Sequence, residues 1–109
     1  MPKISCDTLG VVVHFPDRFE TCAWNDIICI EAWKRDCVGT DVITLDLFRQ
    51  DGTTLFVDEE MEGYDNFLAS ATAHLPAFHR DAWWTLVAFP PFAENRTVIW
   101  NLAGGGSDL

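Results

Sequence analysis

The sequence predicts an α+β fold, in which a strongly curved antiparallel sheet is packed by one main helix around residues 64–75. Three observations support this class. Apolar and polar residues alternate with a period of two in several short segments before residue 58, as they do in half-buried strands. Turn residues separate these segments. The apolar spacing then becomes helical over 64–75.

The first hairpin is expected near the N-terminus. A strand over 10–15 carries its apolar side chains on one face, and these are Val11, Val13 and Phe15. Val12 and His14 lie on the other face. The turn signal Pro16-Asp17-Arg18 follows, and residues 19–24 return as the second strand.

Segment 23–37, AWNDIICIEAWKRDC, is compatible with a helix or a strand. As a helix it has a stripe of Ile27, Ile30, Trp33 and Cys37, with Glu31 and Arg35 as an i,i+4 pair. As a strand it turns Ile28, Ile30 and Ala32 toward the core and Cys29, Glu31 and Trp33 toward the opposite face.

Three isoleucines in four positions favour the strand, since β-branched side chains fit a pleated surface better than a helix. Trp24-Asn25-Asp26 is then the turn that enters this strand. Lys34-Arg35-Asp36 is expected to be its solvated end.

A second hairpin is expected in DVITLDLFRQDGTTLFVDEE. Its turn is Asp51-Gly52, a strong two-residue hairpin signal. The residues predicted to face the core from its two strands are Ile43, Leu45, Leu47, Leu55 and Val57.

The main helix is expected over 63–75. Its apolar side chains recur at helical spacing, and they are Tyr64, Phe67, Leu68, Ala71 and Leu75. Asp65 is the expected N-cap, and Pro76 is expected to end the helix.

The last third of the chain is less regular. Residues 81–88 fit either a short helix or a strand, Pro90-Pro91 requires an extended loop, and 97–102 is expected to close the sheet. We therefore expect one globular domain over 1–103 and a flexible glycine-rich tail over 104–109.

The charge balance excludes several kinds of partner. The chain has seven Lys and Arg against seventeen Asp and Glu, a net charge of −10. Binding to nucleic acid or to anionic lipid needs a basic surface, so neither partner is expected. The acidity serves solubility, or it attracts a basic protein partner.

The compartment is expected to be the cytoplasm. The N-terminus lacks the apolar stretch of a signal peptide, and no apolar run is long enough to cross a membrane. The four cysteines, Cys6, Cys22, Cys29 and Cys37, are then reduced thiols, and none forms a Cys-x-x-Cys pair.

A resemblance covers roughly residues 9–76. The pattern Trp24-x-Asp26-Ile27-x-x-Ile30, the strand with Leu45 and Leu47, the Asp51-Gly52 turn and the helix with Phe67-Leu68 and Leu75-Pro76 resemble bacterial PH-like domains. The chain is also similar to small uncharacterised bacterial proteins that share Trp-x-Asp-Ile, Lys-x-Asp and Glu-x-x-x-Gly, here starting at Trp24, Lys34 and Glu59. The resemblance implies a curved sheet, one helix and a binding role, without the basic loop of phosphoinositide-binding relatives.

Carboxylates are dense where the second hairpin ends. Asp58, Glu59, Glu60, Glu62 and Asp65 lie within eight residues. Their spacing does not match a calcium-binding EF-hand loop, and acidic residues favour helix N-termini, so no metal or other cofactor is expected. An acidic partner-binding face remains an alternative for Glu59, Glu60 and Glu62.

No catalytic residue is assigned. Three cysteines and three histidines could meet in space, but buried thiols are common and no known catalytic motif is present. These residues are Cys22, Cys29, Cys37, His14, His74 and His79. The aromatic residues of the last third are more suggestive. Trp83 and Trp84 are adjacent, so they cannot share one face of a regular element, and they belong either to the core or to an interface.

The sequence therefore favours a small non-enzymatic module that binds protein through an acidic, aromatic-bearing face. Its proposed binding residues are Glu31, Trp33, Glu59, Glu60, Glu62, Trp83 and Trp84. One version is an immunity or antitoxin-like protein that neutralises a basic toxin. The alternatives are a small enzyme or ligand carrier that uses Glu31 or Cys29 in a pocket beside the aromatic C-terminal segment, and a self-associating structural protein.

Overall fold

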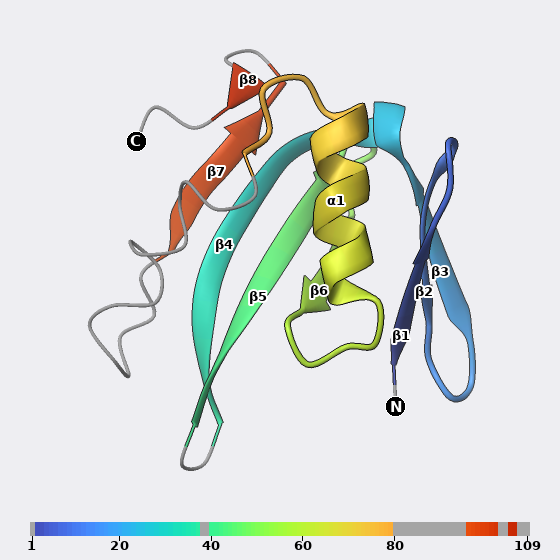
Figure 1. Cartoon of the computed structure of the whole chain (residues 1–109), viewed down its shortest axis with the longest axis vertical. Coiled ribbons are helices and arrows are strands. Elements are labelled where there is room, and N and C mark those ends of the chain that lie inside the picture. Colours follow the sequence, from blue (N-terminus) through green and yellow to red (C-terminus); the bar gives the residue numbers. More distant parts are fainter. Residues whose placement is uncertain (1, 38–39, 80–95, 103–104, 107–109) are drawn as a thin grey trace.

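The computed structural model describes residues 2–37, 40–79, 96–102 and 105–106, and over these residues the fold is α+β. It consists of two antiparallel sheets and one α-helix (Figure 1), and the sheets are not closed into a barrel. The predicted class is confirmed at this level.

The first sheet has three strands in the order of the sequence. They are β1 (Lys3–Cys6), β2 (Gly10–His14) and β3 (Phe19–Ala23). The predicted hairpin is β2 and β3, in which Val11 and Val13 are buried and His14 is exposed. The sequence did not predict β1, which pairs with β2 and contacts the chain near Glu62 through a hydrogen bond from the Ile4 amide.

The second sheet has five strands in the order β6-β5-β4-β7-β8. They are β4 (Ile27–Cys37), β5 (Thr40–Arg49), β6 (Thr54–Asp58), β7 (Thr97–Asn101) and β8 (Gly105–Gly106). The strand in 23–37, the hairpin and the closing strand are confirmed. Gly52 has a φ of 88° in the hairpin turn, a backbone conformation that favours glycine. Two residues of the predicted tail, Gly105 and Gly106, pair with β7.

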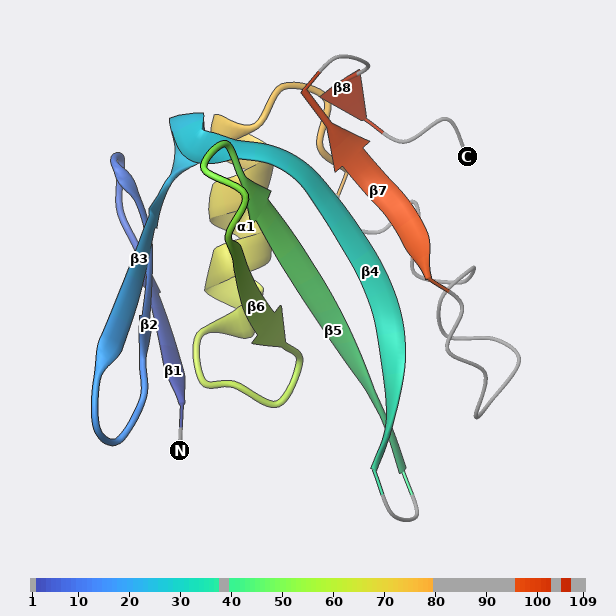
Figure 2. The ribbon, with the colours of Figure 1, turned by 180° about the vertical axis from the view of Figure 1, so that it is seen from behind.

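The turn between the sheets is the short 3-10 helix η1 (Trp24–Asp26). Figure 2 shows the chain passing through it from β3 into β4. The Trp24 indole donates a hydrogen bond to the Asp7 carbonyl at 2.9 Å and stacks on His74 at 5.0 Å. The predicted tryptophan-anchored turn is therefore present, and it ties the junction of the sheets to the helix.

One residue of β4 was assigned to the wrong face. Ile28 was predicted to point into the core, but it is 38% exposed, whereas Ile27 is only 1% exposed. A register shift between Ile27 and Cys29 explains the difference, since the extra residue of a β-bulge changes which side chains face inward.

The end of β4 also differs from the prediction. Lys34 was expected to be solvated, but it is 4% exposed, and its ammonium lies 3.5 Å from the Asp41 carboxylate on β5. Strand alternation places Lys34 on the same face as buried Ala32, and a buried charge requires such a partner. Arg35 is exposed, as predicted, and contacts Asp58 at 3.3 Å.

The helix α1 spans Tyr64–His74. Its N-cap is Gly63 with a φ of 92°, so the prediction of Asp65 as N-cap is wrong; Asp65 lies one residue inside the first turn. The helix ends before Leu75, whose extended backbone is the conformation that a following proline favours.

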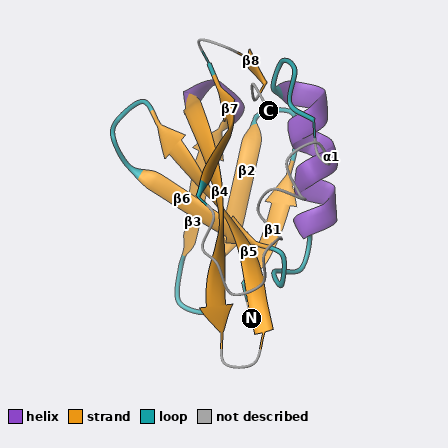
Figure 3. Ribbon diagram, turned by 90° about the vertical axis from the view of Figure 1, so that its left-hand side faces the viewer, coloured by secondary structure: helices purple, strands orange, loops and turns teal. Residues whose placement is uncertain are grey.

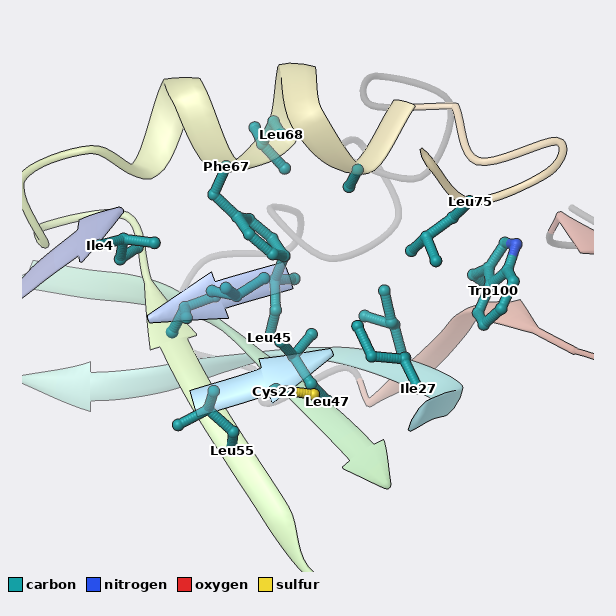
Figure 4. Close-up of a cluster of buried hydrophobic side chains, with 14 of the residues drawn as sticks. Ile4, Cys22, Ile27, Leu45, Leu47, Leu55, Phe67, Leu68, Leu75 and Trp100 are labelled. Carbon is teal, nitrogen blue, oxygen red and sulfur yellow. The ribbon is translucent and has the colours of Figure 1, made fainter. Parts of the chain in front are cut away.

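The core lies between the two sheets and α1. Figure 3 shows α1 along one side of the sheets, and Figure 4 shows Leu45 and Leu47 of β5 in one cluster with Phe67 and Leu68 of α1. The indole of Trp100 donates to the Pro76 carbonyl at 2.8 Å, which joins β7 to the end of the helix segment.

Residues 81–88 and Pro90-Pro91 lie outside the described residues, so their predictions stay untested. Across the described ranges, no helix combines the length and the apolar character that crossing a membrane requires.

Candidate functional site

The strand register places a mixed acidic and apolar row across four strands. Val98 of β7 pairs with Glu31 of β4, Glu31 pairs with Asp46 of β5, and Asp46 pairs with Phe56 of β6. We call these four residues, Val98, Glu31, Asp46 and Phe56, the outer row. Their neighbours along the strands, Ala32 and Leu45, are fully buried, so strand alternation directs the outer row away from the core.

The ends of the outer row are apolar and open to solvent. Val98 is 44% exposed and Phe56 is 43% exposed. The two carboxylates between them are more enclosed, with side-chain exposures of 23% for Glu31 and 16% for Asp46. The row therefore offers two apolar contacts around a central negative charge.

The Glu31–Asp46 pair is unfavourable by itself. Like charges directly opposite in an antiparallel pair destabilise a sheet, in a range of about 0.2–1 kcal/mol for such cross-strand pairs. One nitrogen of Arg96 offsets this repulsion, since Nη1 lies 3.0 Å from Oε1 of Glu31 and 3.4 Å from Oδ2 of Asp46. The Arg96 guanidinium also lies 4.5 Å from the centre of the Trp33 ring.

Trp33 belongs to the next row of the same face, where it pairs with Thr44. The Trp33 indole nitrogen and the Thr44 hydroxyl are both shielded from solvent, and neither makes a hydrogen bond with the residues that the structure describes. Buried polar groups without partners are uncommon. The outer face thus holds two unused hydrogen-bonding groups beside Arg96 and the residues that it contacts, Glu31, Asp46 and Trp33; we call these four residues the Arg96 cluster.

Glu31 and Trp33 were predicted from the sequence as binding residues. The structure places both on the outer face of the five-stranded sheet, in contact with Arg96. The sequence did not predict Asp46, Arg96, Val98 or Phe56. A signal for Asp46 was present, because a carboxylate interrupts an apolar strand segment there. No signal pointed to Arg96, which lies 65 residues from Glu31.

The acidic segment, residues 58–65, uses two of its carboxylates to hold backbone groups. Asp58 accepts hydrogen bonds from the amides of Glu60 and Met61 at 3.0 and 3.1 Å. Glu59 accepts one from the Ile43 amide at 2.9 Å. Both residues therefore have roles in the fold.

The remaining carboxylates of this segment do not converge. Glu62 forms an exposed ion pair with Lys3 at 3.8 Å, and Glu60 is exposed. Among the described residues, no three His, Cys, Asp or Glu side chains are arranged to hold a metal ion. The structure thus places Glu59, Glu60 and Glu62 apart from the outer row.

The thiols are poorly suited to nucleophilic chemistry. Cys6, Cys22 and Cys29 are free. Burial raises the pKa of all three, to about 11 for Cys22, and the Glu31 carboxylate adds to the rise for Cys29. Because the thiolate is the reactive form, these environments disfavour Cys29 as a working nucleophile. The side chain of Cys37 lies outside the described part.

The basic side chains are engaged within the protein. Each Lys or Arg side chain in the described residues contacts a carboxylate, a carbonyl or a hydroxyl, and these residues are Lys3, Arg18, Lys34, Arg35, Arg49 and Arg96. They form no shared basic patch through these contacts.

Three pockets lie away from the outer row. The largest of them, about 520 Å³, is a groove between β1 and α1 lined by Cys6, Asn66 and Ser70 among others. A second of about 290 Å³ lies beside Leu9 and Val12, and a third of about 250 Å³ lies beside Glu59 and Tyr64. None of these three is lined by Glu31 or Cys29.

Trp83 and Trp84 lie outside the described residues, so their predicted role is untested. Comparison of the chain with known protein families, curated proteins and solved structures gave no match. The candidate site therefore rests on the geometry of the outer row and of the Arg96 cluster.

Proposed function

We propose that the protein is a non-enzymatic binding module that recognises a basic protein through the outer face of its five-stranded sheet. The observation that carries this proposal is the Glu31–Asp46 pair, placed directly opposite each other between exposed Val98 and Phe56. Carboxylates surrounded by apolar side chains are complementary to a cationic, partly apolar protein surface.

The energetic argument is that this pair is unfavourable by itself and needs Arg96 to offset it. Two like charges in register lower the stability of the sheet, and an uncharged residue at position 46 would avoid the repulsion. Arrangements that break a local rule of stability are expected at functional sites. The pair is therefore better explained by binding than by folding.

The charge of the whole chain supports the same partner class. A net charge of −10 attracts a basic protein over a distance and increases the association rate at low salt. A specific version is an immunity or antitoxin-like protein whose partner is a basic toxin, for which rapid association would be useful.

Two further expectations belong to this proposal. Free Cys6, Cys22 and Cys29 support a cytoplasmic location, where thiols stay reduced. The antiparallel sheets with one helix support a kinship with PH-like domains, with the difference that the sheets here stay open.

The test is a capture experiment with the immobilised full chain and a lysate of its source organism, at about 0.05 M and about 0.5 M salt. The unmodified chain is expected to retain a basic protein at low salt and to release it at high salt. The variant Glu31→Gln/Asp46→Asn should lose this protein, because it removes both carboxylates of the outer row.

The matched control is Glu60→Gln/Glu62→Gln, which removes the same number of charges from the acidic segment. It should capture the partner normally. Equal capture by the two double variants, or capture that does not respond to salt, would show that the outer row is not the binding face.

A further inference from the structure

The contacts of Arg96 indicate which side chain the outer row is built to receive. Its guanidinium meets the Glu31 carboxylate at 3.0 Å, the Asp46 carboxylate at 3.4 Å and the face of Trp33 at 4.5 Å. Carboxylates and an aromatic face are the groups that bind a guanidinium most specifically. The contacts of Arg96 thus show that the site is complementary to a guanidinium group.

Arg96 leaves part of the acceptor capacity unused. Glu31 and Asp46 bind the same nitrogen, Nη1, each through one oxygen. Within the described part of the chain, Oε2 of Glu31 and Oδ1 of Asp46 accept no hydrogen bond. A guanidinium has five donors in a planar fork, so one that approaches from a partner can reach oxygens that Arg96 does not contact.

The contact of Arg96 with Glu31 and Asp46 is also weak enough for an arginine of a partner to replace Arg96. The Arg96 side chain is 45% exposed. A single ion pair of exposed side chains shifts a conformational equilibrium by about fivefold or less, and the Arg96 side of both ion pairs is open to solvent. In addition, Arg96 buries neither Val98 nor Phe56, which stay 44% and 43% exposed, so a partner residue gains apolar contacts there that Arg96 does not provide.

We propose that an arginine of the basic partner takes the place of Arg96, with its guanidinium between Glu31 and Asp46 and against the Trp33 ring. Arg96 is then a resident competitor that occupies the site in the free protein. This inference rests on the proposed function and deepens it, because it names the side chain that the outer row recognises.

The test uses N-acetyl-arginine amide as the probe and N-acetyl-lysine amide as the matched control. Both are titrated into the full chain while the indole N–H resonance of Trp33 is followed by NMR. The arginine derivative should shift this resonance in the unmodified protein. In Arg96→Met, which keeps an apolar stem over the ring, it should bind about two- to fivefold more tightly, because the competitor is gone.

The variant Glu31→Gln/Asp46→Asn should lose the arginine-dependent shift, and the lysine derivative should bind more weakly throughout. If Arg96→Met fails to fold, Arg96→Gln provides the same comparison. Equal affinity of Arg96→Met and the unmodified protein would overturn the proposal, as would equal binding of the two derivatives.

The two proposals fail separately. A partner that is captured through Glu31 and Asp46 while the arginine derivative does not bind would overturn only the arginine exchange. Binding of the arginine derivative without any captured partner would instead overturn the proposed function.

Discussion

Carboxylates gather in two regions of this molecule, and they have opposite relations to the fold. In the acidic segment, Asp58 and Glu59 accept backbone amides and so stabilise the end of the second hairpin. In the outer row, Glu31 and Asp46 face each other across two strands and depend on Arg96 to offset their repulsion.

The difference shows that carboxylates close in the sequence and carboxylates brought together by strand pairing have different roles in this protein. The acidic segment is conspicuous in the sequence because its five carboxylates lie within eight residues, and carboxylates so close in the sequence can bind nearby backbone amides. The Glu31–Asp46 pair is inconspicuous in the sequence because only the pairing of β4 with β5 brings the two residues together. Only the second arrangement sets two carboxylates against each other and needs a distant guanidinium to offset their repulsion, and this is why we place function there.

The largest effect is expected at Asp58, which is 7% exposed. Asp58→Ala removes the carboxylate that accepts hydrogen bonds from the Glu60 and Met61 amides and contacts Arg35, while the Met61 amide keeps the Asp58 carbonyl as a second acceptor. The free energy of unfolding should fall by about 2 kcal/mol. Urea denaturation measures this loss. Asp58→Asn, which keeps one acceptor oxygen, should lose less than half as much; an Asp58→Ala variant as stable as the unmodified chain would refute the structural role.

A smaller effect is expected at Glu59. Glu59→Ala removes the acceptor of the Ile43 amide and should cost about 1 kcal/mol in the same denaturation experiment. Glu59→Gln should cost little, because the amide oxygen can accept the same hydrogen bond. If Glu59→Gln is as destabilised as Glu59→Ala, the charge and not the hydrogen bond is what matters.

The smallest effect is expected at Asp51 in the hairpin turn. Hydrogen bonds from the Thr53 hydroxyl and amide lower the pKa of the Asp51 carboxyl in the folded chain. A carboxyl with a lowered folded pKa stabilises the fold above its unfolded pKa of about 4, and this contribution is lost as the pH falls through the folded value.

Asp51→Asn should therefore flatten the acid side of the stability profile, measured as the urea midpoint between about pH 5 and about pH 2. The profile near neutral pH should keep its shape. An acid profile unchanged by Asp51→Asn would contradict the local role of this carboxylate and would separate it from Asp58 and Glu59.

The fold was predictable from the sequence where the pattern is local. Alternation and turn signals predicted the two hairpins, β-branched isoleucines predicted the strand in 23–37, and helical spacing predicted α1; the expected closing strand is also present. The strand β1 was missed because Lys3–Cys6 is too short for its alternation to stand out. Ile28 was misplaced because a β-bulge decides which way it faces, and the bulge is not visible before the register is known. Lys34 was misplaced because its charge suggested solvent, although alternation puts it on the face of Ala32; its partner Asp41 becomes evident only with the strand pairing.

The candidate site was predictable only in part for the same reason. Glu31 and Trp33 share a strand face, so alternation alone put them together. Asp46 joins them through the pairing of β4 with β5, and Arg96 reaches Asp46 from 50 residues away. Such contacts follow from tertiary packing, which no local pattern contains.

The measurement that tests the central claim most directly is a double-mutant cycle between Glu31 and Asp46. It is made in an Arg96→Met background, where no guanidinium masks their repulsion, and it compares Glu31→Gln, Asp46→Asn and the combination by urea denaturation. We predict that Asp46→Asn raises stability by about 0.5 kcal/mol when Glu31 is present and has no such effect when Glu31 is replaced by Gln. A loss of stability of the same size in both cases would mean that the outer carboxylates serve the fold, and it would contradict their assignment to binding.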